Sequence, residues 1–424
     1  MREFREQTVA EFDRTERALF ARISSIENEL ALLSNSAASF VKAVKNLNSM
    51  QTQTKDLVER NNRDIRVLRK RVTSEFKQRV ESDLNDLKLL SREMLRATFE
   101  VSLILGQNPP DVISMDVAKR LLDDYITSGD IVRTQPLLEY FDLQDDLSVT
   151  DLRTIYRGLR AAGYWGQALK VLRVVARKSR RENDVRAIAK IEHEISAYSC
   201  NDRDVPDFPE GSCYDPEGPI LHMVGRVLPD TQTGYTLRTH YTATAQARKG
   251  LPVAIVGQPG ITDRNLKETE RYTHQGIDYY LLPGPSRKEA LLDEWLVSAV
   301  KNVALLVQQL RPSILHAQSD FFNALIAQMV GKEYGIPTVY ESRGFWEESW
   351  LSRTITAQGW GANAEEIFQK YSLPDAYILR KRAEEIVRQR ADHVFTLAEV
   401  MQNHILESAD GAIEPQQSLL SRTP

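Results

Sequence analysis

The first quarter of the chain lacks the two residues that most often interrupt a helix. Residues 1–105 contain no glycine and no proline, and these residues weaken or break helix interiors wherever they occur. A segment without them is unsuited to a fold built on tight turns. We therefore expect a long α-helix over residues 1–105, ended by Gly106 and the Pro109-Pro110 pair.

Cysteine is also scarce, since Cys200 and Cys213 are the only two in 424 residues. Two thiols outside any metal-ligand spacing exclude a disulfide scaffold and a cysteine-based zinc site, and we expect no metal. The N-terminus lacks an apolar core of signal-peptide length, and no apolar run approaches the roughly 18 residues of a membrane span. We expect a cytoplasmic protein without a transmembrane segment, with peripheral attachment at the inner membrane face left open.

A strong excess of one charge is missing too. The 55 basic and 59 acidic residues give a formal net charge of -4. Nucleic-acid-binding domains usually carry a clear basic excess, so we expect no nucleic-acid partner. Hydrophobic residues make up 42% of the chain, which is sufficient to build a buried core.

An apolar seam runs along the first helical segment. Its members lie three and four residues apart, at Ile23, Ile26, Leu30, Leu33, Ala37, Phe40, Val44 and Leu47. The seam turns polar at Gln51 and Thr54 and resumes at Val58, Ile65, Leu68 and Val72. Its phase then shifts through Phe76, Val80, Leu84 and Leu87, as at a heptad stutter. Such a stripe is dry only when another helix covers it. The pattern predicts a coiled coil, either an extended rod that forms a homo-oligomer or a hairpin folded near the polar patch, and we favour self-association.

Residues 106–199 show the spacing of short amphipathic helices. The clearest pair turns at Gly163 and carries apolar residues at Leu152, Ile155, Leu159, Trp165, Ala168, Leu169, Leu172 and Val175. This order resembles one tetratricopeptide unit, although no repeat of fixed period follows. We expect a helical-hairpin region that packs on neighbouring helices, with a peptide-binding groove as the alternative. Residues 200–218 are rich in Pro, Gly and Asp and predict a linker.

From residue 219 onward, short apolar runs alternate with segments of helical spacing. Strands are expected at "PILHMV", "PVAIVG", "IDYYLL", "SILHA", "PTVYES" and "DHVFTL", and helices at 236–249, 288–309 and 321–334. This alternation predicts a doubly wound parallel sheet with helices on both faces, which is a Rossmann-like α/β fold. We place this domain at residues 219–407, followed by an irregular tail at 408–424.

Glycine and polar residues follow the carboxyl ends of the expected strands, where ligands bind in open parallel sheets. The spacing around Gly234 is not that of a dinucleotide-binding loop, but a helix that begins there presents N–H groups suited to phosphate or sugar oxygens. Structural interpretations stay open for three of these residues. Gly234 can relieve a turn, His316 can cap backbone, and Arg343 can form an ion pair with Glu341 or Glu347.

Four blocks occur in order: "LPDTQTGYTLRTH", "ILHAQSDFFNAL", "GIPTVYESRGFWEESW" and "ADHVFTLAEVM". Together they resemble the amino-terminal domain of the family 4 glycosyltransferases of GT-B fold. The resemblance implies a nucleotide-diphosphate sugar as donor, sugar transfer with retention, and no metal or other cofactor. It also implies a cleft between two Rossmann-like domains and, as acceptor, a polysaccharide or a lipid-linked molecule.

The resemblance implies roles for single residues as well. Gly234 and Tyr235 would line the donor-phosphate side, and the acceptor-side candidates are Arg238, His316, Gln318, Ser319, Arg343 and Glu347. Gln318 replaces the second histidine of the family's His-x-His-like block and does not transfer a proton at neutral pH. The catalytic residue therefore stays unassigned. Ala398 stands where the family commonly has a serine.

The family's donor-binding half is not evident in the sequence. The residues after Leu406 show no strand pattern, no basic phosphate site and no Glu-x7-Glu element. We expect this half to come from a second domain or a second chain, with a truncated or a naturally split enzyme as the two readings. The competing hypothesis is a catalytically inactive, oligomeric protein that serves assembly or binds a glycan.

Overall fold

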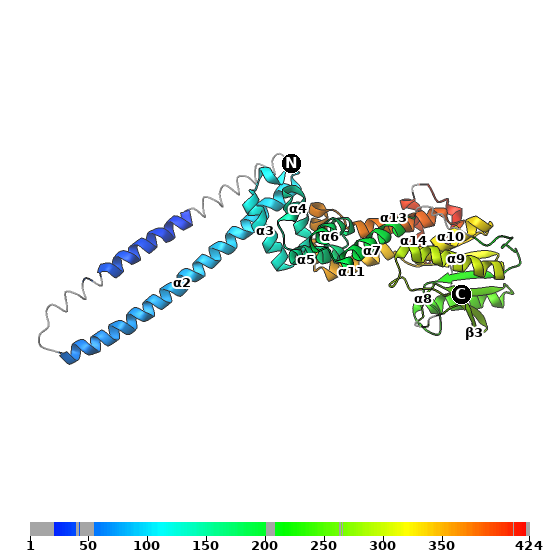
Figure 1. The fold of residues 1–424 in the computed structure, drawn as a ribbon, viewed down its shortest axis with the longest axis horizontal. Coiled ribbons are helices and arrows are strands. Elements are labelled where there is room, and N and C mark those ends of the chain that lie inside the picture. Colours follow the sequence, from blue (N-terminus) through cyan, green and yellow to red (C-terminus); the bar gives the residue numbers. More distant parts are fainter. Residues whose placement is uncertain are drawn as a thin grey trace. The chain divides into compact units, whose positions relative to one another are not determined.

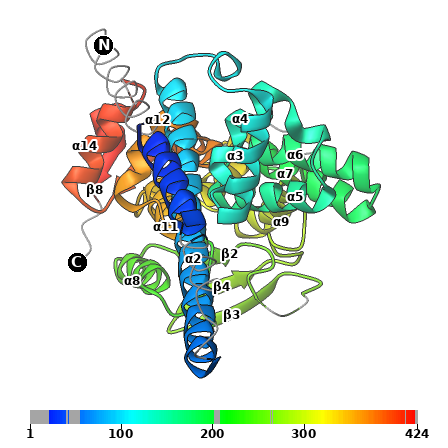
Figure 2. The same ribbon diagram turned by 90° about the vertical axis from the view of Figure 1, so that its left-hand side faces the viewer.

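The computed structural model describes residues 21–39, 42, 55–200, 208–262, 264, 266–409 and 411–420. The chain divides into two compact units, Met1–Ser91 and Arg92–Pro424 (Figure 1, Figure 2). Among the helices of the described residues, none is long and apolar enough to cross a membrane.

The first unit is helical wherever it is described. Residues 21–39 are helical, and the 50-residue helix α2 (Lys55–Ile104) begins in this unit. Seam residues Leu68, Val72 and Phe76 are exposed, so the apolar stripe is present and pairing with a second helix stays a prediction. The polar patch at Gln51 and Thr54, like Phe40, Val44 and Leu47, lies outside the described residues.

The second unit begins with a series of short helices. They are α3 (Met115–Ser128), α4 (Thr134–Phe141), α5 (Val149–Ala162), α6 (Trp165–Ser179) and α7 (Glu182–Tyr198). Helix α5 contacts α6, and α6 contacts α7. Helix α5 starts where the Ser148 hydroxyl accepts a hydrogen bond from the Asp151 backbone N–H, and it ends at Gly163 with φ 87°. This left-handed conformation favours glycine and produces the hairpin that the sequence predicts.

A single sheet follows in the described residues. Its strands are β1 (Ile220–Val224), β2 (Val253–Gly257), β3 (Glu270–His274), β4 (Ile277–Leu281), β5 (Ile314–Gln318), β6 (Thr338–Ser342), β7 (His393–Thr396) and β8 (Ser418–Leu420). The strand order is β3-β4-β2-β1-β5-β6-β7-β8, and β3 alone pairs antiparallel. The predicted α/β Rossmann-like fold is therefore confirmed.

Two edge strands were missed by the sequence analysis. Strand β3 reads "ERYTH", with every second residue exposed, and a half-exposed edge strand has no continuous apolar run. Strand β8 is three residues long and lies within the segment expected to be an irregular tail. That expectation is wrong, because Ser418–Leu420 pairs with β7 and extends the sheet by one strand.

The remaining helices cover both faces of the sheet. They are α8 (Gly234–Arg248), α9 (Leu292–Leu310), α10 (Phe321–Tyr334), α11 (Trp346–Ala357), α12 (Ala364–Tyr371), α13 (Asp375–Arg390) and α14 (Glu399–Ser408). Helix α8 contacts β1, β2 and β4, whereas α10 contacts β1, β5 and β6 (Figure 1). Because side chains alternate along a strand, Val224 joins the core under α8 while Leu221 and Met223 join the other core.

The helical region and the sheet share one hydrophobic core within the second unit. That core extends from Phe99 to Ile413. The Asp375 carboxylate accepts hydrogen bonds from the backbone N–H groups of Trp165 and Gly166, both at 2.6 Å, and so caps the start of α6. The segment 106–199, predicted as a region of its own followed by a linker at 200–218, packs as part of the same compact unit.

Candidate functional site

A polar cavity of about 260 Å³ lies at the carboxyl ends of β1 and β5, beside the starts of α8 and α11. We call it the strand-end hollow. It is lined by Val224, Gly225, Arg226, Thr233, Tyr235, Thr236, Thr239, Arg287, Gln318, Ser319, Asp320, Arg343 and Trp346. Its position is the one that parallel-sheet topology predicts for a ligand. A larger cavity of about 540 Å³, lined by Gly331, Thr338 and Asp392 among others, lies at the amino ends of β6 and β7.

The start of α8 explains the cluster of hydroxyls that follows β1. The Thr233 hydroxyl accepts from the backbone N–H of Thr236 at 3.4 Å, and the Thr236 hydroxyl accepts from the backbone N–H of Thr233 at 2.9 Å. This reciprocal pair is a capping box, which orders the first turn. Gly234 has no left-handed φ, and a Cβ there would meet no atom within 4 Å. The interpretation that Gly234 relieves a turn is therefore not supported, while its expected place on the donor-phosphate side stays a prediction.

An aromatic pair stands at the hollow. Tyr235 is 46% exposed, and its ring centroid lies 5.4 Å from that of Trp346 at an interplanar angle of 33°. Exposed aromatic rings of this kind offer a flat apolar face to a sugar or a base. Tyr235, expected on the donor-phosphate side, lies in the lining of the hollow.

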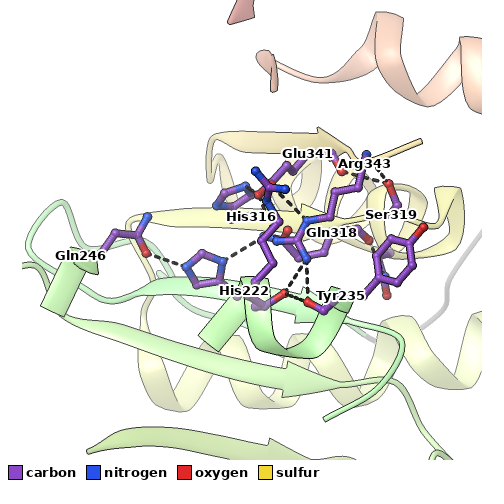
Figure 3. A network of polar contacts seen from close by, with 11 residues as sticks. His222, Tyr235, Gln246, His316, Gln318, Ser319, Glu341 and Arg343 are labelled. Carbon is purple, nitrogen blue, oxygen red and sulfur yellow. Dashed lines mark hydrogen bonds and ion pairs between the residues drawn. The ribbon is translucent and has the colours of Figure 1, made fainter. Parts of the chain in front are cut away.

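A continuous polar stripe crosses the face of β1, β5 and β6 (Figure 3). His222 is the register partner of His316, and Gln318 is the register partner of Glu341. Since side chains two residues apart share a face, these four side chains lie together on one side of the sheet. Each of the four is at most 4% exposed.

Glu341 is the centre of this stripe. Its carboxylate accepts hydrogen bonds from Arg343 Nε at 3.0 Å and Nη2 at 3.3 Å. His316 Nε2 lies 3.4 Å away and Arg238 Nε 3.7 Å away. Burial alone raises the pKa of Glu341, but the nearby His316 and the Arg343 guanidinium outweigh burial and hold that pKa well below its ordinary value. Glu341 is therefore a buried carboxylate among basic groups at neutral pH.

Arg343 lines the hollow, but several of its donors already have partners. Its Nη1 donates to the Tyr235 carbonyl oxygen at 2.9 Å and to the Thr239 hydroxyl at 2.8 Å. Its backbone N–H donates to the Ser319 hydroxyl at 2.8 Å, and that hydroxyl donates to the Glu341 carbonyl oxygen at 3.0 Å. The ion-pair interpretation of Arg343 with Glu341 is thus what the structure shows. Arg343 links α8 to β6 and shapes the wall of the hollow.

His316 and Glu347 lie away from the lining. The His316 ring is 4.7 Å from that of His222 and contacts Glu341 inside the stripe. Glu347 belongs to a second buried cluster, in which Arg388 Nη2 lies 3.4 Å from Glu347 and 3.3 Å from Glu384. The Tyr340 hydroxyl donates to Glu384 at 2.7 Å. The structure therefore does not bring these two sequence-predicted residues into the hollow.

The second cluster contains two carboxylates and one guanidinium. Burial raises the pKa of Glu384 to about 7 and also raises that of Glu347, while the Arg388 charge opposes both shifts. One cation cannot compensate two buried anions. With its pKa raised to about 7, Glu384 is therefore partly protonated near neutral pH.

Arg287 and Asp320 were missed by the sequence analysis. Arg287 Nη1 donates to the Asp320 carboxylate at 2.9 Å, and its guanidinium lies 5.4 Å from the Trp295 ring and 5.1 Å from the Phe322 ring. Asp320 directly follows Ser319 at the carboxyl end of β5, where ligand-binding residues are expected in a parallel sheet, so it could have been found from the sequence. Arg287 lies in a loop after β4, where no local pattern marks it. With the exposed Arg226, the hollow has three arginines and one aspartate in its lining.

The described residues hold no group of three or more His, Cys, Asp or Glu side chains placed to bind a metal ion. The strand-end hollow is instead suited to an anionic, hydroxyl-rich ligand. Arginine pairs with phosphate and carboxylate, a helix N-terminus favours anions, and amide and hydroxyl side chains hydrogen-bond sugar hydroxyls.

Residues 233–415 match the model of a family described as "Glycosyl transferase 4-like domain". The match confirms the resemblance seen in the four sequence blocks. No curated protein is similar enough to the chain to count as a match.

Solved structures with partial similarity include sucrose-phosphate synthase from Thermosynechococcus elongatus, at 13% identity and a TM-score of 0.34, covering 48% of this chain and 47% of that one. UDP-N-acetylglucosamine 2-epimerase from Rickettsia bellii has 12% identity and a TM-score of 0.30, covering 49% and 45%. UGT2 of Phytolacca americana, complexed with UDP-2fluoro-glucose and pterostilbene, has 12% identity and a TM-score of 0.28, covering 50% and 54%. The chain spans about half the length of these structures.

Proposed function

Because residues 233–415 form a glycosyl transferase 4-like domain, we propose that the chain supplies the acceptor-side half of a sugar-transferring enzyme. The donor would be a nucleotide-diphosphate sugar, and the acceptor a polysaccharide or a lipid-linked molecule. Transfer would proceed with retention and without a metal or other cofactor. The observation that carries this proposal is the strand-end hollow, where basic, aromatic and amide side chains gather at the carboxyl edge of the sheet.

The basic groups of the hollow support an anionic donor. Arg343 already donates to Glu341, Tyr235 and Thr239. Arg226 is exposed, and the Arg287 side chain is 35% exposed. A diphosphate that approaches the start of α8 would meet these two arginines and the first N–H groups of the helix. Arg287 would then exchange part of its contact with Asp320 for a phosphate oxygen.

The leaving diphosphate also needs stabilisation from its other side. Charge that develops on a departing diphosphate is stabilised best by preorganised donors placed around it. The hollow is built on one sheet only, at the strand ends of β1 and β5. We therefore include a second nucleotide-binding half in the proposal, contributed by another domain or another chain.

Replacing Arg287 with methionine is expected to weaken binding of UDP-glucose, UDP-N-acetylglucosamine or GDP-mannose by about tenfold or more, because a charge-assisted hydrogen bond to phosphate is lost. Calorimetric titration of the full chain with each nucleotide sugar measures this effect. The matched control is Arg271→Met, which removes an arginine that donates to an aspartate (Asp278, 2.7 Å) outside the hollow. No binding of any nucleotide sugar, or equal loss in both variants, would contradict the proposal.

We further propose that the apolar seam of α2 pairs with a second copy of the chain. Val72 lies in the seam and is 63% exposed, whereas Val67 lies outside the seam and is 64% exposed. A charge inside a coiled-coil seam is desolvated on pairing and opposes it. We expect Val72→Asp to lower the association constant about tenfold or more and Val67→Asp to leave it unchanged. Sedimentation velocity of the full chain tests this, and a chain that is monomeric without substitution refutes self-association.

A further inference from the structure

Gln318, one of the residues that line the hollow, carries a buried polar atom without a hydrogen-bond partner among the described residues. The residue is 2% exposed and lines the strand-end hollow. Its amide Nε2 lies 3.0 Å from His222 Nδ1, while its Oε1 has no hydrogen-bond partner among the described residues. Leaving a buried acceptor without a donor is energetically unfavourable, because the acceptor has lost its hydrogen bonds to water. An atom of this kind in a native cavity calls for a ligand or another partner that satisfies it.

A relay of three side chains sets the direction of this amide (Figure 3). Gln246 Oε1, on α8, lies 2.7 Å from His222 Nε2, and Gln318 Nε2 lies 3.0 Å from His222 Nδ1. An amide oxygen only accepts, so His222 carries its proton on Nε2 and donates it to Gln246. His222 Nδ1 is then an acceptor, and the Gln318 amide nitrogen must donate to it. Consequently Oε1 is the free end of the Gln318 side chain.

The interior position of His222 keeps this arrangement in one protonation state. His222 is fully buried, and its ring lies 4.7 Å from that of His316. Burial and the neighbouring His316 lower the pKa of His222 to about 3, so the ring is neutral at physiological pH. A protonated ring would have two donors and would force the Gln318 amide to turn around.

We infer that Gln246 and His222 are positioning residues that make Gln318 Oε1 a hydrogen-bond acceptor for a hydroxyl of the bound sugar. This inference rests on the proposed function for the identity of the ligand. The hollow then selects a ligand that donates a hydrogen bond at this point. A fluorine or methoxy group in place of that hydroxyl leaves Oε1 unsatisfied, and the binding free energy that the bond supplies is lost.

The ligand-free part of the inference is tested by the tautomer of His222. The experiment is ¹⁵N NMR of the full chain with ¹⁵N-labelled histidine, assigned by comparison with His222→Phe and, as matched control, His240→Phe. His240 also contacts a glutamine, Gln275, at 3.0 Å, and neither residue lines the hollow. We expect His222 to be protonated on Nε2 and to stay so from pH 5 to pH 8. Protonation on Nδ1 would overturn the inference, because Gln318 would then present its amide nitrogen.

The ligand-dependent part is tested by titrating the full chain at pH 8 with UDP-glucose and its four monodeoxyfluoro analogues. One analogue is expected to bind the unchanged protein about tenfold more weakly than UDP-glucose, since fluorine does not donate a hydrogen bond. In Gln246→Leu this discrimination should vanish, because the tautomer of His222 is no longer set. Gln246→Glu should keep the discrimination, because the carboxylate still accepts a hydrogen bond from His222 Nε2–H.

A failure of the proposed function and a failure of the inference about Gln318 give different results. Absence of binding by UDP-glucose, UDP-N-acetylglucosamine and GDP-mannose alike contradicts the proposed function, while the His222 tautomer still decides whether the relay is as described. Binding of UDP-glucose without any discrimination against the fluoro analogues overturns the inference and leaves the proposed function standing. Discrimination that survives Gln246→Leu also overturns it.

Discussion

The Glu341→Gln variant is expected to unfold with a free energy about 3–5 kcal/mol lower than that of the unchanged protein. Glu341 is 1% exposed and accepts from two atoms of the Arg343 guanidinium. The amide keeps the volume of the carboxylate but removes its charge, so Arg343 is left as a buried cation without an anion. Urea unfolding of the full chain at pH 7, followed by tryptophan fluorescence, measures the loss.

The control for this variant is Glu270→Gln. Glu270 also accepts a hydrogen bond from an arginine, Arg264, at 2.6 Å, but its side chain is 39% exposed. Exposed ion pairs contribute about 0–1 kcal/mol, so this variant should lose little stability. The double variant Glu341→Gln, Arg343→Met should lose less stability than the two single variants together. Each single variant leaves one buried charge unpaired, whereas the double variant leaves none. Equal effects of Glu341→Gln and Glu270→Gln would show that the buried pair does not stabilise the fold.

The Glu384→Gln variant is expected to remove most of a stability decline of about 3 kcal/mol between roughly pH 4.5 and pH 8. Burial raises the pKa of Glu384 from 4.5 to about 7 in the folded chain, and this difference corresponds to about 3 kcal/mol. Between these two pKa values the folded state binds more protons than the unfolded state. Stability associated with Glu384 is therefore complete below pH 4.5 and is lost as the pH rises through about 7.

At pH 5 the protonated carboxyl and the amide make similar hydrogen bonds, so the variant and the unchanged protein should be nearly equally stable. At pH 8 the variant should be the more stable of the two. Urea unfolding at both pH values tests this, with Glu385→Gln as the control, because Glu385 is the half-buried neighbour of Glu384 on α13. A variant that loses stability at pH 8 would refute the assignment of the raised pKa to Glu384.

The sequence alone was sufficient to predict the fold class and the position of the candidate site. Runs such as "ILHMV" and "PVAIVG" are short, apolar and bounded by turn residues, and these are local properties of a few neighbouring residues. Parallel pairing also fixes which ends of the strands share one edge of the sheet, so Gln318, Ser319 and Arg343 could be placed at the hollow. A buried polar residue in an apolar run, His222, was a visible signal that was not used.

Only the tertiary structure decided which of these side chains face each other. His222 meets His316, and Gln318 meets Glu341, because β1, β5 and β6 pair in one particular register. Glu347 turns toward Arg388 because α11 packs on α13. The edge strand β8 pairs with β7 without an apolar run of its own. Hydrophobic periodicity is a property of neighbouring residues and can be seen in one sequence. Strand register and helix packing depend on contacts between segments far apart in the chain, which one sequence does not reveal.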